Sequence, residues 1–538
     1  MSVLAAEHLH LTFPNQTVPV LQDINLKIEE GTLTVILGES GCGKTTLLNI
    51  LAGFQKPSSG QITLDHEVVT APDARRAVVF QDHALLPWLN VSENIGFALQ
   101  LKGLKEQHIH QQVESILKIV GLSHVAQANI WELSGGMKQR VGIARALISH
   151  AAFILLDEPF AALDAFTRET MQQLVLDLWI QQNKSFFLIT HDIEEALLLS
   201  NQLVLMTARP GKIVETLKLD FAERYKQGES IRTIKSDPKF IQLREQLFER
   251  LRVQKQAGDT AELAQIDPKK SASRQNALGD FLARHRSLVL SLSSVISVLV
   301  IWYLITVLKV VPSLFLPSPQ AVWQKFLEVS QQGFMKATLW QHLAASISRV
   351  LLALVAAIAI GVPLGLWMGL NKWVRAVLDP LVELLRPIPP LAYLPLLVIW
   401  FGIGETTKVL LIFFSILAPV IISSTHGVIS HQLNRERAAL SLGASQSQVF
   451  WHVILPTALP HILTGIRIGL GVGWSTLVAS ELVAADRGIG FMVQSAAQFL
   501  ITDTVVLGII VIAIVAVSFE LFLRWLQKQL SPWYGQQL

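Results

Sequence analysis

One stretch decides the fold of the first half of this chain: Gly38-Glu39-Ser40-Gly41-Cys42-Gly43-Lys44-Thr45. It fits the pattern G-x-x-x-x-G-K-[ST], in which backbone N–H groups of a glycine-rich loop surround phosphate oxygens. The apolar run 33–37 before it is typical of a buried strand, and residues 46–51 after it are typical of a helix. In that context Lys44 is expected to reach the β- and γ-phosphates and Thr45 to bind Mg²⁺, with Thr46 completing the nucleotide site.

Length and composition exclude a single soluble domain. The chain has 538 residues, of which 51% are hydrophobic and only 16% are charged, and its mean hydropathy is +0.44. Soluble proteins carry about a quarter charged residues, and the deficit here lies in the C-terminal half. The net charge of +3 gives no indication of a nucleic-acid partner, and the single cysteine, Cys42, excludes an internal disulfide.

The chain divides into three parts by pattern. Residues 1–252 alternate short apolar strands with amphipathic helices, which predicts an α/β domain. Residues 253–280 are polar and predict a linker, and residues 281–538 predict an all-α polytopic membrane domain with about six spans. The N-terminus has no basic segment followed by an apolar run, so we expect the first domain to stay in the cytosol. The bilayer is then a partner, and the predicted location is the inner (plasma) membrane.

The predicted spans each approach the roughly 20 residues that cross a bilayer. They lie near 287–308, 345–369, 388–403, 407–429, 461–485 and 504–524. The third is short and rich in proline, so a re-entrant or buried helix is the alternative there, with an odd number of crossings. The segments predicted to face the cytosol carry more Arg and Lys, which modestly supports six crossings.

A second apolar strand predicts the catalytic carboxylates. The run 153–156 ends in Asp157 and Glu158. Asp157 is placed to hold Mg²⁺, and Glu158 to polarise a water for in-line attack on the γ-phosphate.

Between these two motifs stands Leu133-Ser134-Gly135-Gly136-Met137-Lys138-Gln139-Arg140, and here the chain resembles the ATP-binding-cassette (ABC) family. The resemblance implies that Gln81 senses Mg²⁺, that His191 is a switch histidine and that Phe13 stacks on adenine. It also implies that Ser134, Gly135 and Gly136, with Asp164, face the ATP held by an opposite subunit. A second copy of the chain is therefore an expected partner, with ATP and Mg²⁺ as ligands and hydrolysis of ATP as the reaction.

An inner segment of the membrane domain resembles the coupling loop of binding-protein-dependent importers. It runs Arg437-Ala438-Ala439-Leu440-Ser441-Leu442-Gly443 and, nine residues later, Val453-Ile454-Leu455-Pro456. The family usually has Glu where this chain has Arg437. The resemblance assigns coupling to Ala438, Ala439, Gly443 and Pro456.

Charged residues within predicted spans are costly and suggest function. Arg467 near the start of the fifth span and Glu481 near its end are two of them. Our hypothesis is that Arg467 lines the translocation path and favours an anionic solute, and the alternative is pairing between helices.

Longer phrases resemble importers of the nitrate, sulfonate and taurine family, with the ATP-binding and permease subunits fused end to end. They are 157–168, 228–240, 333–344 and 471–482. The resemblance implies a type I importer permease, a separate periplasmic or lipid-anchored solute-binding protein, and taurine or an alkanesulfonate as the solute. Nitrate, other aliphatic sulfonates and an aminopyrimidine remain alternatives, as do an exporter and a signalling complex.

Overall fold

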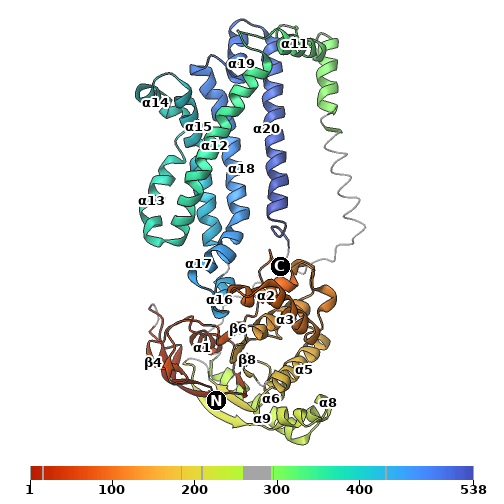
Figure 1. The fold of residues 1–538 in the computed structure, drawn as a ribbon, viewed down its shortest axis with the longest axis vertical. Helices are drawn as coiled ribbons and strands as arrows, with labels where there is room; N and C mark the ends of the chain where they lie inside the picture. Colours follow the sequence, from red (N-terminus) through yellow and green to blue (C-terminus); the bar gives the residue numbers. More distant parts are fainter. Residues whose placement is uncertain are drawn as a thin grey trace. The chain divides into compact units, whose positions relative to one another are not determined.

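The structure, a computed structural model, describes residues 2–14, 17–182, 184–207, 210–258, 293–294, 296–430 and 433–536. They form two compact units, both drawn in Figure 1. The α/β unit comprises Met1–Gln265, His431–Pro456 and Gly535–Leu538, and the helical unit comprises Ile266–Ser430 and Thr457–Tyr534. Segment 431–456, which the sequence places between two spans, therefore packs with the α/β unit.

The predicted linker is only partly described. Helix α9 (Pro238–Gly258) continues past residue 252, where we predicted the first domain to end. Residues 259–280 of the predicted linker lie outside the described residues, and so does the beginning of the first predicted span, 287–308.

Two sheets form the centre of the α/β unit. A four-stranded antiparallel sheet has the order β2-β1-β4-β5, and a six-stranded sheet has the order β10-β9-β3-β8-β7-β6. The strands are β1 (Val3–Leu11), β2 (Leu21–Glu29), β3 (Leu33–Leu37), β4 (Ser59–Leu64), β5 (Glu67–Val68), β6 (Arg76–Val79), β7 (Phe153–Asp157), β8 (Ser185–Thr190), β9 (Gln202–Met206) and β10 (Ile213–Lys218).

The six-stranded sheet is parallel except for its edge strand β10. Strands β3, β6, β7 and β8 are buried along their whole length, as continuous apolar strands of a parallel sheet covered on both faces are. Their register places Leu37 opposite Thr190 and Asp157 opposite Ile189. The loops that follow β3, β7 and β8 therefore leave the sheet at one edge, where ligands bind in α/β folds.

Nine helices of the described residues 2–258 belong to this unit. They are α1 (Lys44–Leu51), α2 (Val91–Leu101), α3 (Glu106–Ile119), α4 (Gly135–Ile148), α5 (Ala165–Gln182), α6 (Ile193–Leu198), α7 (Phe221–Lys226), α8 (Ile231–Lys235) and α9. Segment 431–456 adds α16 (Leu433–Ser441), α17 (Gln446–Val449) and a π-helical turn (Phe450–Ile454).

The helical unit is all α in the part of the chain that the structure describes. Its helices are Ile296–Val307, α11 (Pro319–Gln331), α12 (Leu339–Leu370), α13 (Lys372–Leu385), α14 (Leu394–Phe401), α15 (Glu405–Ile429), α18 (Leu455–Ala484), α19 (Ile489–Gln498) and α20 (Thr502–Leu530). Four helical stretches of the described residues are long and apolar enough to cross a membrane, and they match four predicted spans. They are Leu339–Leu370, Glu405–Ile429, Gln446–Leu482 and Thr502–Leu530.

The third predicted span, 388–403, is not one straight helix. Helix α13 and the pair formed by a 3₁₀ turn (Pro390–Tyr393) and α14 meet at an angle of 91°. Prolines 387, 389 and 390 explain the break, because proline removes backbone donors and restricts the residue before it. The eight residues of α14 extend only about 12 Å, so this region fits the predicted alternative of a re-entrant or broken segment.

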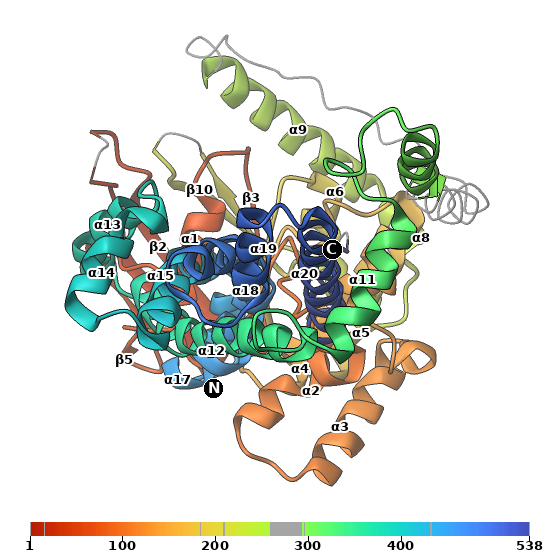
Figure 2. The ribbon, with the colours of Figure 1, turned by 90° about the horizontal axis from the view of Figure 1, so that it is seen from above.

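Glycines bring α12 and α18 close to α15, and Figure 2 shows these three helices side by side as seen from above. A Cβ at Gly365 of α12 would lie 2.6 Å from the carbonyl oxygen of Ile421, and a Cβ at Gly469 of α18 would lie 2.9 Å from Ile416. Both partners belong to α15. Small residues at helix contacts are the usual means of close packing in membranes.

We expect Gly365→Ala to destabilise the protein by about 1–3 kcal/mol, because the added methyl group meets backbone and not a flexible side chain. Gly471→Ala in α18 is the matched control, since a Cβ there meets nothing within 4 Å, and it should be neutral or stabilising by up to about 1 kcal/mol. Thermal unfolding of the purified chain in detergent compares the two. Equal unfolding temperatures for both variants would contradict the packing argument.

Candidate active site

The loop after β3 is built around its glycines. Gly41 and Gly43 have φ values of +82° and +97°, which favour glycine, and a Cβ at Gly38 would lie 2.8 Å from the carbonyl oxygen of Met206. Lys44 is buried, and its ammonium donates to the carbonyl oxygens of Gly38 and Glu39 at 2.6 and 2.8 Å. The curled backbone at the start of α1 thus forms the anion-binding arrangement that the sequence predicts.

Asp157, at the end of β7, faces this loop. The Thr45 hydroxyl donates to Asp157 Oδ1 at 3.3 Å, and the carboxylate is only 8% exposed. Burial raises the pKa of Asp157 to about 6, although the hydrogen bond from Thr45 acts in the opposite direction. A buried carboxylate beside a hydroxyl oxygen supplies the hard oxygen donors that Mg²⁺ prefers, with phosphate oxygens completing its shell.

Glu158 lies beside the predicted switch histidine. Its backbone N–H donates to Ile189 of β8, and its Oε2 is 3.4 Å from His191 Nδ1. Glu158 has a φ of +42°, which is rare for a residue with a side chain and is found at functional sites. The register of β7 and β8 therefore brings together two residues that are 33 positions apart in the sequence.

The signature residues form a second group with the start of α5. Ser134 caps α4 by accepting from Met137 N at 3.4 Å, and a Cβ at Gly136 would lie 2.4 Å from Thr167. Asp164 accepts from the backbone and hydroxyl of Thr167 at 3.1 and 2.6 Å, and these bonds lower the pKa of its carboxyl. Among the described residues, no side-chain hydrogen bond or ion pair links this group to the loop after β3.

The remaining predicted site residues lie on the loops around β1, β3, β6 and α4, and most of them are exposed. Gln81 follows β6 at the carboxyl edge of the sheet, and Phe13 lies in the loop after β1 with 38% of its surface exposed. Gly135 and Ser40 are exposed, and Thr46 and Cys42 lie in the first turn of α1 and just before it, with Cys42 buried.

Segment 431–456 is held in the α/β unit by the residues around Gln81. Ser441 Oγ accepts from the N–H of Val78 at 3.4 Å, and Arg435 Nε donates to the carbonyl oxygen of Leu85 at 3.1 Å. Ala438 and Ala439 are 2% exposed, and Ala438 belongs to the apolar core of the unit. Three of the four predicted coupling residues therefore lie in or beside this contact, since Gly443, with a φ of +91°, approaches Ala74.

Arg437 replaces the expected Glu without loss of a partner. Its guanidinium lies 5.5 Å from the ring centroid of Phe54, and burial lowers its pKa. The fourth predicted coupling residue, Pro456, is half-buried at the start of α18 and follows the π-helical turn. Such a turn accommodates the hydrogen bond that proline cannot make.

Arg467 is paired in the helical unit. Its Nε is 3.1 Å from Glu520 Oε1, and Glu520 also accepts from Arg524 at 2.8 Å. An anion that reached Arg467 would therefore compete with Glu520.

Sequence reasoning missed a cluster in which buried Arg349, Lys408 and Glu481 meet the largely exposed Glu405. Lys408 lies in α15 and is buried. One sequence feature could have found the cluster: Arg349 is the only charged residue between Lys336 and Lys372.

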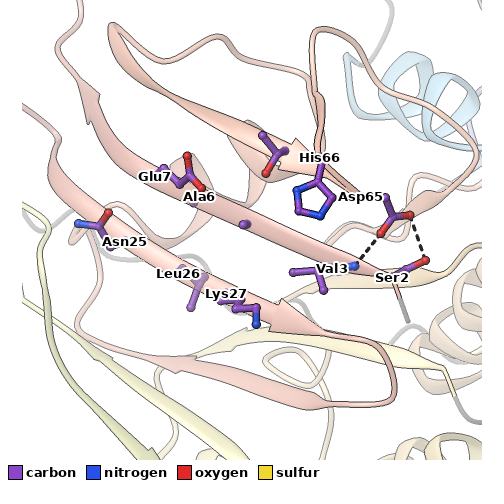
Figure 3. Close-up of a pocket in the computed structure, with 11 residues that line it drawn as sticks. Ser2, Val3, Ala6, Glu7, Asn25, Leu26, Lys27, Asp65 and His66 are labelled. Carbon is purple, nitrogen blue, oxygen red and sulfur yellow. Dashed lines mark hydrogen bonds between the residues drawn. The ribbon is translucent and has the colours of Figure 1, made fainter.

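An open hollow over the four-stranded sheet lies apart from the predicted site residues (Figure 3). It is bordered by β1, β2 and the turn at Asp65, whose carboxylate accepts from Val3 N at 2.8 Å. None of the predicted nucleotide residues lines it.

Comparison with known families gives two matches along the chain. The ABC transporter family matches residues 21–161, and the family of binding-protein-dependent transport system inner membrane components matches residues 361–535.

Individual relatives match each half nearly completely. The taurine transport system permease protein TauC of Escherichia coli (strain K12) is 60% identical over 252 residues, covering 47% of this chain and 92% of TauC. The taurine import ATP-binding protein TauB of Pseudomonas entomophila (strain L48) is 51% identical over 256 residues, covering 48% of this chain and 99% of TauB. A solved dimeric ATP-binding cassette with ADP and Pi is 30% identical, covers 40% of this chain and 98% of that chain, and has a TM-score of 0.36.

The α/β unit is thus an ATP-hydrolysing cassette, and the helical unit is a multi-pass permease. The chain belongs to the ABC transporter family, with the ATPase and the permease of a binding-protein-dependent import system fused in one polypeptide. Hydrolysis of ATP is coupled to transport.

We expect Asp157→Asn to stabilise the chain when no metal or nucleotide is present. The folded pKa of about 6 lies above the unfolded value of 3.8, so ionisation costs stability at any pH above 6, by about 3 kcal/mol, and the cost falls to about half of that at pH 5. Unfolding followed in EDTA at pH 8 and pH 5 should show Asn more stable, with a smaller gain at pH 5. Asp220→Asn, on an exposed aspartate, is the control, and an Asp157→Asn protein less stable than wild type at pH 8 would contradict the assignment.

Proposed function

We propose that this chain imports taurine into the cell at the expense of ATP hydrolysis. The observation that carries the proposal is the pair of matches on one polypeptide: TauB-like sequence in the ATPase half and TauC-like sequence in the permease half, each covering more than nine tenths of the relative. The proposed location is the inner membrane, with the ATPase unit in the cytoplasm.

The ATP site follows from the carboxyl edge of the sheet. The loop 38–46 binds the phosphates, with Lys44 opposite their charge, and Phe13 stacks on the adenine. Thr45 and Asp157, with Gln81, would hold Mg²⁺, which would screen the phosphate charge. Glu158 polarises the attacking water, and His191, 3.4 Å from it, orients the glutamate and the γ-phosphate.

A second copy of the chain completes each site. The absence of any side-chain bond between the loop 38–46 and the group around Ser134 and Asp164, within the described residues, supports this arrangement. Ser134, Gly135 and Gly136 stand at the start of α4, where free N–H groups and the helix dipole favour an anion. In the proposed dimer this anion is the γ-phosphate bound by the other copy.

Segment 431–456 is the proposed coupling element. Ser441 and Arg435 bind backbone groups on either side of Gln81, so a change at the γ-phosphate reaches the permease through this contact. A separate solute-binding protein delivers taurine, and Arg467 is the proposed path residue, with Glu520 as its counter-ion.

We expect Glu158→Gln to lower ATP turnover by about 10²–10³-fold, because the amide cannot accept the proton of the attacking water. Binding of ATP should stay within about threefold of wild type, since the phosphate loop is untouched. Glu169→Gln, an exposed position on α5, controls for the change of charge. Turnover by Glu158→Gln within a few fold of wild type would remove Glu158 from the catalytic role.

We expect vesicles that contain the full chain and a taurine-binding protein to take up labelled taurine only with ATP and Mg²⁺. Wild type should transport taurine at least about tenfold faster than nitrate, and Glu158→Gln should not transport. Uptake of nitrate but not taurine would overturn the assignment of the solute. In the same assay, full uptake by Arg467→Leu at a normal protein level would remove Arg467 from the path.

A further inference from the structure

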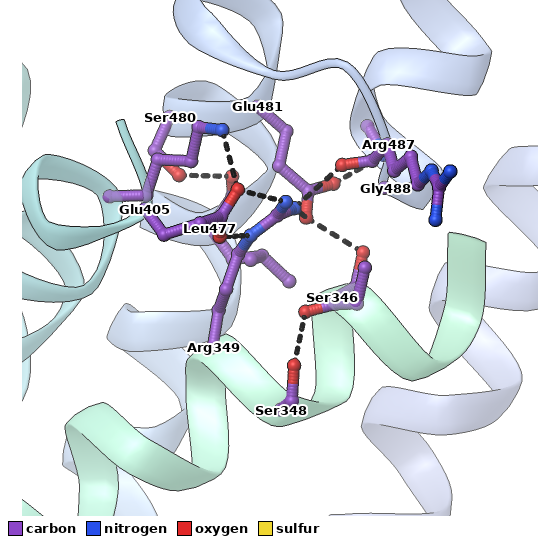
Figure 4. A network of polar contacts seen from close by, with 12 residues as sticks. Ser346, Ser348, Arg349, Glu405, Leu477, Ser480, Glu481, Arg487 and Gly488 are labelled. Atoms are coloured by element: carbon purple, nitrogen blue, oxygen red, sulfur yellow. Dashed lines mark hydrogen bonds and ion pairs between the residues drawn. The ribbon is translucent and has the colours of Figure 1, made fainter. Parts of the chain in front are cut away.

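Three long helices of the helical unit contribute charged side chains to one cluster (Figure 4). Arg349 of α12 donates from Nη1 to Glu481 of α18 at 2.6 Å, and it donates from Nε and Nη2 to Glu405 of α15 at 2.6 and 2.8 Å. Lys408, one turn along α15, donates to Glu405 at 2.9 Å. Glu405 thus has both cations as partners, and its contact with Arg349 is bidentate.

The two carboxylates are held very differently. Glu481 is fully buried and also accepts from the Ser346 hydroxyl at 2.7 Å and the Gly490 N–H at 2.8 Å. The Glu405 side chain is 62% exposed, and in the described part of the chain its side-chain bonds go only to Arg349 and Lys408. Glu481 is therefore a fixed part of the fold, whereas Glu405 can turn into water without breaking any other bond.

The charges of the cluster decide what must happen if Glu405 leaves. With Glu405 in place, two cations face two carboxylates and the cluster is neutral. Without it, Arg349 and Lys408, which are 5% and 4% exposed, face Glu481 alone with a net charge of +1. A buried charge without compensation is strongly unfavourable, so the departure of Glu405 requires one singly charged anionic group from solution in its place. That group is a free anion, or the sulfonate of a zwitterion such as taurine whose ammonium group stays in water.

The geometry of the vacated position suits a sulfonate. A planar guanidinium presents two parallel N–H groups that bind two oxygens of an oxyanion at once, and a sulfonate has a third oxygen left for Lys408. Glu405 is the first residue of α15, so free N–H groups of the first turn also favour an anion there.

The cluster lies at the start of α15, at the opposite end of the helix from the chain connection to segment 431–456. Glu405 is about 36 Å along the helix from Ile429, after which the chain enters that segment. In an importer with a cytoplasmic ATPase, that end faces the side from which solute arrives.

We propose that Glu405 is an exchangeable counter-ion, and that Arg349 and Lys408 form a sulfonate-binding site at the outer end of the permease once the solute displaces it. The choice of sulfonate among monovalent oxyanions rests on the proposed taurine import. Release of Glu405 also frees the start of α15 from α12, so binding of the anion loosens the outer end of these helices.

The test measures the thermal unfolding temperature of the full chain in nanodiscs at constant ionic strength, with chloride replaced by methanesulfonate. Glu405→Gln removes the charge and keeps the shape, and it should unfold at a lower temperature than wild type in chloride. Methanesulfonate or taurine should raise its unfolding temperature by about 3 °C or more, against less than about 1 °C for wild type. If Glu405→Gln unfolds at the same temperature in methanesulfonate as in chloride, the site is overturned.

Two further variants test the charge count. Glu405→Gln combined with Lys408→Met leaves Arg349 and Glu481 neutral together, so the response to sulfonate should disappear, and a response that persists overturns the proposal. Glu328→Gln removes a carboxylate from an exposed pair of the same spacing, Lys325 and Glu328 at 2.8 Å, and should give no response. If Glu405→Gln does not fold, Glu405→Asp takes its place. Methanesulfonate should raise the unfolding temperature of Glu405→Asp by a smaller amount, and no rise overturns the site.

The outcomes separate this site from the proposed solute. A sulfonate response in Glu405→Gln together with no taurine uptake by wild type would support the site and overturn taurine import. Taurine uptake by wild type with no sulfonate response in Glu405→Gln would overturn the site alone.

Discussion

The parallel pairing of β3, β8 and β7 is the constraint on which the nucleotide site depends. These strands are buried on both faces, and their register fixes the level at which each one ends. Because they end together, the loop 38–46, the carboxylates after β7 and the histidine after β8 share one edge. The burial that holds the strands also surrounds Asp157, so the raised pKa of its carboxyl comes from the same apolar core that positions it.

The outermost strand of this sheet, β6, explains where segment 431–456 binds. Strand β6 is an edge strand, and edge strands carry free backbone donors. Ser441 accepts from one of them, at Val78, three residues before Gln81. Small side chains at 438 and 439 let the short helix approach the sheet closely enough for that bond. Helix α16 is therefore joined to β6 by a hydrogen bond and by core packing.

Features built from residues that are neighbours in the sequence could be predicted from the sequence alone. The phosphate loop and the strand ending in Asp157 and Glu158 are continuous patterns, so both could be predicted, and so could four long apolar helices. The contacts that join distant positions could not. No spacing rule links Glu158 to His191, and none links Arg349 to partners 56 and 132 residues further along. For the third span, the prolines indicated a re-entrant or broken segment as the alternative, but the angle of 91° could not be predicted from them.

One stripe on α12 connects the packing of the permease with its buried charges. Arg349, Ala353, Ala357, Gly361 and Gly365 recur every four residues, which places them on one ridge that winds slowly around the helix, and all five are buried. The glycines of this stripe set how near α15 lies, since a Cβ at Gly361 or Gly365 would touch Val420 or Ile421. At the other end of this ridge, the Arg349 guanidinium spans from Glu481 to Glu405. The tight glycine contact at Ile421 and the charged cluster at Glu405 lie about 24 Å apart along the same helix, so a tilt of α15 about the glycine contact displaces Glu405 more than the residues between them.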